Sequence, residues 1–89
     1  MTPMTPAEKE RAAKVAKGLS EAQLAALQYA RPVGVHYQFA FEPEDGREVR
    51  TGDALVRKGL AEWAGSRGYR AWLTPLGLAV RNHLTEQNQ

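Results

Sequence analysis

Residues 54–77 read ALVRKGLAEWAGSRGYRAWLTPLG, and this stretch contains the strongest structural signals of the chain. Gly59 follows a helix-like segment and predicts a left-handed helix end. Two short runs of strand-like residues, 60–63 and 69–73, flank the glycine-containing loop AGSRG of residues 64–68. That arrangement is typical of a β-hairpin. The stretch therefore predicts the end of one helix and a hairpin directly after it.

Capping residues mark the starts of further helices. A hydroxyl or carboxylate before the first helical residue accepts backbone N–H groups, and proline is tolerated at the first helical position. Such starts lie at Thr5 with Pro6, at Ser20 with Gln23, and at Thr74 with Pro75. The first helix should end at Gly18 and has only a thin apolar stripe, so we expect a peripheral arm or a dimer contact.

Between the second and third helices, apolar residues alternate with polar or small ones from Val33 to Phe41. This two-residue period predicts one long strand with one buried face. An acidic turn follows at residues 42–46. The third helix then has two candidate caps, Asp45 and Thr51, and we favour Thr51. The choice decides whether Arg47 and Arg50 lie on the helix or on the segment before it.

The composition fits one small domain. The chain has 89 residues, of which 43% are hydrophobic and 25% charged, and it contains no cysteine. No apolar run approaches the roughly 20 residues of a membrane span, and the polar start does not resemble a signal peptide. We therefore expect a cytoplasmic protein. The net charge is only +2, but residues 47–81 carry seven basic and three acidic side chains, a concentration that favours an anionic partner.

The run from Thr51 through Ala54 to Glu62, followed by Tyr69 to Gly77, resembles the recognition helix, wing and next helix of winged helix-turn-helix DNA-binding domains, as in MarR-like regulators. The predicted elements follow the order helix, helix, strand, helix, strand, strand, helix, and the resemblance implies that they form an α+β winged-helix fold with a small antiparallel sheet. It divides the chain into a helical arm (1–18), a winged-helix domain (19–85) and a frayed tail (86–89).

The same resemblance implies a function. The family places one helix in the major groove of duplex DNA and the hairpin over the backbone or minor groove. We therefore expect a small transcriptional regulator that contacts DNA through helix 51–58 and wing 60–73. The implied DNA-binding residues are Arg50, Thr51, Ala54, Arg57, Lys58, Arg67 and Arg70.

One feature departs from the family. A short positioning helix normally precedes the recognition helix, whereas this chain has the predicted strand 33–41 and the acidic turn there. Three acids of that segment, Glu42, Glu44 and Asp45, would come near DNA phosphates. The departure supports an alternative: a protein-interaction module on a degenerate winged-helix scaffold, which docks a protein partner through strand 33–41 or an aromatic surface.

The remaining predictions concern assembly and chemistry. One short recognition helix contacts few bases, so we expect a homodimer that binds two half-sites. Val15 and Trp72 are its interface candidates. His36 and His83 have no paired ligand at helical spacing, so we predict no metal site. We also predict no cofactor and no catalytic residues, because no nucleophile motif or phosphate-binding loop is present.

Overall fold

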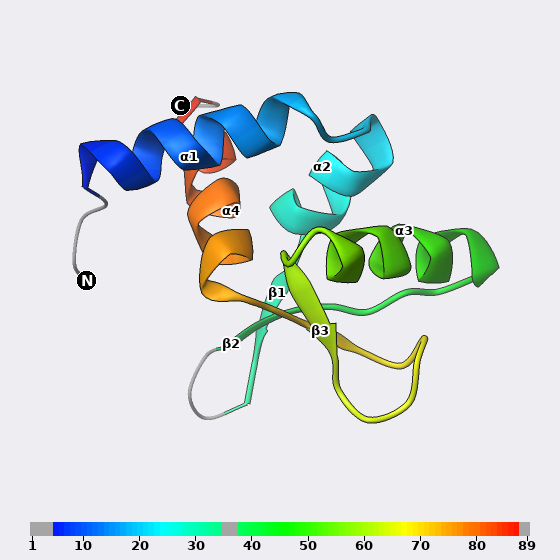
Figure 1. Cartoon of the computed structure of the whole chain (residues 1–89). Coiled ribbons are helices and arrows are strands. Elements are labelled where there is room, and N and C mark those ends of the chain that lie inside the picture. Colours follow the sequence, from blue (N-terminus) through cyan, green and yellow to red (C-terminus); the bar gives the residue numbers. More distant parts are fainter. Residues whose placement is uncertain (1–4, 35–37, 88–89) are drawn as a thin grey trace.

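The computed structural model describes residues 5–34 and 38–87, and it shows an α+β protein (Figure 1). The described residues form four helices and one antiparallel sheet of four strands in the order β1-β2-β4-β3. The elements in chain order are α1 (Pro6–Lys17), α2 (Glu21–Gln28), β1 (Arg31–Val33), β2 (Gln38–Phe41), α3 (Gly46–Arg57), β3 (Ala61–Trp63), β4 (Ala71–Leu73) and α4 (Pro75–Gln87).

The prediction of a single strand from Val33 to Phe41 is wrong. Two strands lie in this region, β1 and β2, and they pair antiparallel with Pro32 opposite Phe39. Gly34, directly after β1, has a φ of +79°, a left-handed conformation that glycine adopts without steric cost and that ends the extended run. Pro32 lies in the edge strand, where its missing N–H removes no necessary ladder bond. Residues 35–37, including His36, lie outside the described residues.

The preference for Thr51 as the cap of the third helix is also wrong. Asp45 has an extended backbone, and its carboxylate accepts the N–H of Glu48 at 2.9 Å, so α3 begins at Gly46. The Thr51 hydroxyl instead donates to the carbonyl of Arg47 within the helix. Because the helix starts six residues earlier than expected, Arg47 and Arg50 are helical.

The predicted caps and hairpin are confirmed. Thr5 caps α1, and Ser20 forms a reciprocal capping box with Gln23. Gly59 has a φ of +76°, and the N–H of Leu60 donates to the carbonyl of Leu55 at 2.9 Å, which closes α3. Strands β3 and β4 pair antiparallel as the predicted hairpin.

The core lies between the sheet and the helices, which Figure 1 shows gathered on one side of it. Its largest fully buried side chains are Leu27, Leu55, Leu60 and Val80. Helix α1 packs against α4 and buries Ala12 completely. Within residues 5–34 and 38–87, no helix has the length and apolar character needed to cross a membrane.

Candidate nucleic-acid interface

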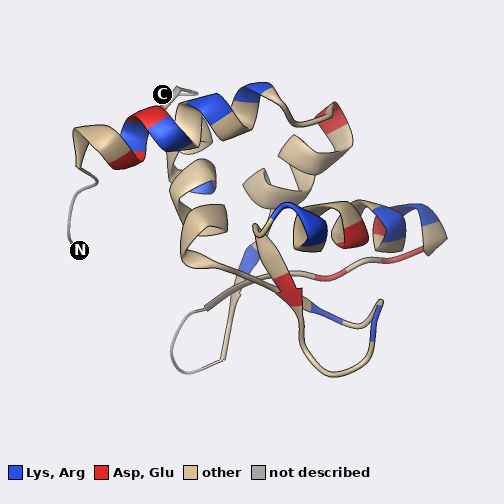
Figure 2. Cartoon of the chain, in the orientation of Figure 1, with Lys and Arg blue, Asp and Glu red and all other residues tan. Residues whose placement is uncertain are grey.

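Helix α3 presents a basic face to solvent. Arg47, Arg50 and Arg57 are exposed and recur at helical spacing on one side, with the half-buried Ala54 among them. Lys58, the residue after the last helical one, is also exposed. We call these four cations the α3 basic face. Figure 2 shows the blue segments along this helix, with red segments between them.

No member of the α3 basic face forms an ion pair with another described residue, since the described pairs involve other arginines only. The two acids of the same helix form hydrogen bonds with other parts of the chain. Glu48 accepts the backbone N–H of Glu44 at 3.4 Å, and Asp53 binds the hairpin. The α3 basic face is therefore accessible to an external anion.

The first arginine of the hairpin folds back onto α3. Arg67 donates from Nε to both carboxylate oxygens of Asp53, at 3.0 and 2.9 Å, and from Nη2 to Oδ2. The indole Nε1 of Trp63 donates to the same carboxylate at 3.1 Å. The hydrogen bonds from Arg67 hold the pKa of Asp53 below its usual value, with a further contribution from Trp63. Asp53 thus attaches the hairpin to the middle of the helix.

The second hairpin arginine lies on the outer face of the sheet. Arg70 donates to Glu42 at 3.2 Å, and Arg31 donates to the other oxygen of the same carboxylate at 3.1 Å. These two hydrogen bonds lower the pKa of Glu42, the one from Arg31 most. The Arg70 guanidinium also stacks 5.5 Å from the ring centroid of the half-buried Trp72. Both hairpin arginines are therefore already bound to carboxylates of their own chain.

The structure brings only part of the predicted site together. Arg50, Ala54, Arg57 and Lys58 share one surface, and Thr51 is half-buried beside them. Arg67 joins α3 through Asp53, whereas Arg70 and Trp72 lie on the outer face of the sheet. The predicted interface residue Val15 is half-buried against the core.

One residue of this surface was missed. Arg47 was left out of the predicted site, and the cap at Asp45 was the signal that could have placed it there.

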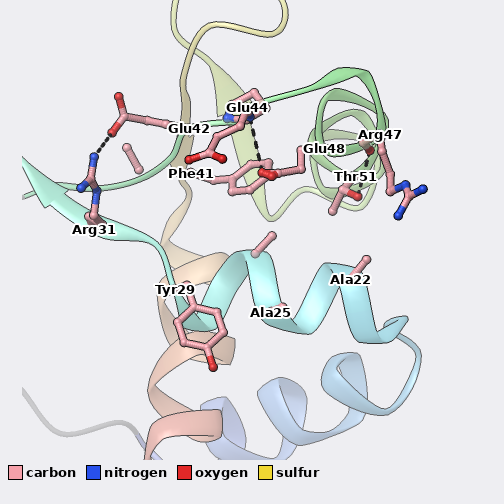
Figure 3. Close-up of a pocket in the computed structure, with 13 residues that line it drawn as sticks. Ala22, Ala25, Tyr29, Arg31, Phe41, Glu42, Glu44, Arg47, Glu48 and Thr51 are labelled. Carbon is pink, nitrogen blue, oxygen red and sulfur yellow. Dashed lines mark hydrogen bonds and ion pairs between the residues drawn. The ribbon is translucent and has the colours of Figure 1, made fainter.

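A hollow lies between α2 and α3 (Figure 3). It has a volume of about 600 Å³, and three alanines of α2 line one side, including Ala25. The acidic segment lines another side, where Glu42 is paired with Arg31. Asp45, the third acid of that segment, caps α3.

Comparison of the chain with protein-family models, with curated proteins and with solved structures finds no match.

Proposed function

We propose that this protein binds duplex DNA through the α3 basic face, with the β3–β4 hairpin beside it as a wing. The observation that carries the proposal is the set of four exposed cations on one helix face, none paired with a described acid. Phosphate binding by such cations releases counterions from DNA, which is the main source of non-specific affinity. The antiparallel hairpin after α3 supports a winged-helix arrangement.

Spacing along α3 also supports this proposal. Arg47 and Arg57 are ten residues apart, so they are separated by about 15 Å along the helix axis at 1.5 Å per residue. The major groove is about 12 Å wide, which lets cations near both ends of the helix approach phosphates on its two sides. Ala54 and Thr51 lie between them and would face base edges. A single short helix contacts few bases, so we propose a regulator that acts as a homodimer and gains sequence specificity by binding two half-sites.

A titration with mixed-sequence duplex DNA at two salt concentrations tests the proposal. We expect Arg50→Ala with Arg57→Ala to weaken binding and to reduce the slope of log affinity against log salt by about 1.8, since each lost phosphate contact contributes about 0.9. The matched control is Lys9→Ala with Lys14→Ala, which removes two exposed cations from α1. Equal loss in both variants would indicate only a net-charge effect and would contradict binding through α3.

The hollow between α2 and α3 favours a second candidate function, docking of a protein partner. An interface of that kind would depend weakly on salt because few counterions are released. Salt-insensitive binding of a protein, together with no affinity for duplex DNA at low salt, would support this candidate over the first.

A further inference from the structure

Four residues form a row across the sheet. Arg31 of β1 lies opposite Ala40 of β2, and Ala40 lies opposite Trp72 of β4. Trp72 in turn lies opposite Glu62 of β3. Residues directly opposite each other in antiparallel strands have their side chains on the same face of the sheet. The row therefore crosses all four strands on one face, with an arginine at one end and a glutamate at the other.

The row lies on the face that points away from the helices. Successive side chains of a strand point to opposite faces of a sheet. Phe39 and Phe41, the neighbours of Ala40 in β2, pack against the core, and so does Trp63, the neighbour of Glu62 in β3. Ala40 and Glu62 are therefore on the outer face, which the described helices leave uncovered (Figure 1).

Both ends of the row carry charge that is open to solvent. The side chain of Arg31 is 76% exposed although it donates to Glu42, and its guanidinium has further N–H donors. Glu62 is exposed and forms no ion pair with another described residue. With Arg70, which binds the second oxygen of Glu42, these side chains amount to two positive and two negative charges. Such a balanced surface does not favour a polyanion.

The row is complementary to a second copy of itself. Consider a two-fold axis between two facing sheets, parallel to the strands and midway between β2 and β4. The rotation reverses the order of the row, so Arg31 of each copy faces Glu62 of the other. Facing sheets pack about 10 Å apart, a distance that an arginine and a glutamate can bridge together. Reciprocal contacts of this kind are what a closed dimer requires.

Trp72 supplies the apolar centre of this arrangement. Its half-buried indole lies beside the axis and faces the Ala40 position of the other copy. Ala40 is only 1% exposed although its side chain points to the uncovered face, so its neighbours on that face close over it. The centre of the face is thus aromatic and the ends are charged, as in stable protein interfaces.

We infer that the outer face of the sheet is the contact between two copies of this chain, centred on Trp72 and closed by two Arg31–Glu62 ion pairs. The inference goes beyond the proposed function, because self-association through this face needs no DNA. Helix α1, the other candidate for a dimer contact, packs its buried Ala12 against α4 of its own chain. The dimer also leaves α3 accessible, because α3 packs on the opposite face of the sheet through Trp63.

Sedimentation equilibrium of the full chain without DNA, over a range of protein concentrations, tests the inference. We expect a monomer–dimer equilibrium. Glu62→Arg places two like charges together at both ends of the dimer and should raise the dissociation constant at least about tenfold, and Arg31→Glu should do the same. Glu10→Arg makes the same change of charge at an exposed position of α1, so it should leave the dissociation constant unchanged.

An equimolar mixture of the Arg31→Glu and Glu62→Arg chains separates loss of the ion pairs from general damage. In a mixed dimer, opposite charges meet again at both ends, so we expect mixed dimers with a dissociation constant near that of the unmodified protein. Native mass spectrometry identifies them by mass, and circular dichroism confirms that each variant is folded.

Three results would overturn the inference: a protein that stays monomeric up to about 1 mM, a dimer that both charge reversals leave intact, or a mixture that forms no mixed dimers. None of these measurements contains DNA, so they leave the α3 proposal standing. Absence of duplex binding by an unmodified protein that dimerises in this way would overturn the proposed function alone.

Discussion

The indole ring of Trp63 fills the space beside Gly52. Its Cη2 and Cζ2 atoms lie 2.5 and 2.8 Å from the position that a β-carbon on Gly52 would occupy. One residue further along α3, Asp53 accepts the indole N–H at 3.1 Å. The two contacts together seat the helix on strand β3 at the middle of the helix. The orientation of the α3 basic face therefore depends on a residue with no side chain.

Gly52→Ala should destabilise the protein, although glycine to alanine inside a helix usually stabilises it by about 1 kcal/mol. The added methyl would overlap the buried side of the Trp63 ring. Overpacking of this kind costs about 1–3 kcal/mol, so we expect a lower free energy of unfolding by about that amount. Urea denaturation monitored by tryptophan fluorescence measures the change.

Gly46→Ala is the control for Gly52→Ala, because Gly46 begins the same helix and a β-carbon there would meet no atom within 4 Å. It should be neutral or slightly stabilising. Trp63→Phe in the Gly52→Ala background should recover part of the loss, since the smaller ring leaves room for the methyl. A Gly52→Ala protein as stable as the unmodified one would refute the steric role of Trp63.

Gly77 makes a second close approach, between α4 and the start of the hairpin. A β-carbon at Gly77 would lie 2.1 Å from the carbonyl oxygen of Leu60, which also accepts the N–H of Thr74 at 3.0 Å. Backbone atoms cannot move aside as a flexible side chain can, so Gly77→Ala should lower the melting temperature and cost at least about 2 kcal/mol. Gly18→Ala, with its nearest contact at 3.6 Å, should change the melting temperature little. Similar melting temperatures for the two variants would argue against this packing.

Thr74 should stabilise the folded protein by capping helix α4. Its hydroxyl accepts the N–H of Gly77 at 3.1 Å and donates to the carbonyl of Gly59 at 2.6 Å, which links α4 to the end of α3. We expect Thr74→Val to reduce the free energy of unfolding by about 1 kcal/mol, the usual value of an N-cap. Thr85→Val removes a hydroxyl that, among the described residues, donates to the carbonyl of Arg81 within α4 and links no second element, so it should have a smaller effect. The prediction fails if both variants unfold at the same urea concentration.

The sequence predicts the parts of this fold that depend on neighbouring residues. The caps at Thr5 and Ser20, and the left-handed end at Gly59, each involve residues only a few positions apart. Such signals rest on local hydrogen bonds and do not require knowledge of the tertiary packing. The wrong cap for the third helix also concerns a local signal, because both Asp45 and Thr51 can cap a helix. The structure uses Asp45. This cap gives the longer helix, and a longer helix can pack more of its surface on the core.

The contacts that define the candidate site are not local, and the sequence does not reveal them. Arg67 reaches Asp53 across 14 positions, and Arg70 reaches Glu42 across 28. In the sequence these arginines resemble free basic residues, because charge clustering shows where cations occur along the chain but not which acids meet them. Similarly, the alternation from Val33 to Phe41 does not show that two separate strands, β1 and β2, pair antiparallel in this region.

Acid should weaken the Asp53–Arg67 attachment. Hydrogen bonds from Arg67 lower the pKa of Asp53 in the folded state, so its contribution to stability is present above the unfolded pKa of about 3.9 and is lost as pH falls through the lower folded value. Asp53→Asn should therefore unfold at lower urea concentration than the unmodified protein at about pH 7, and the difference should shrink at about pH 2.5. Glu62→Gln removes an exposed carboxylate that has no ion pair within the described residues, and it should show little difference at either pH. A difference in stability between Asp53→Asn and the unmodified protein that stays constant with pH would mean that the carboxylate charge does not hold the hairpin against α3.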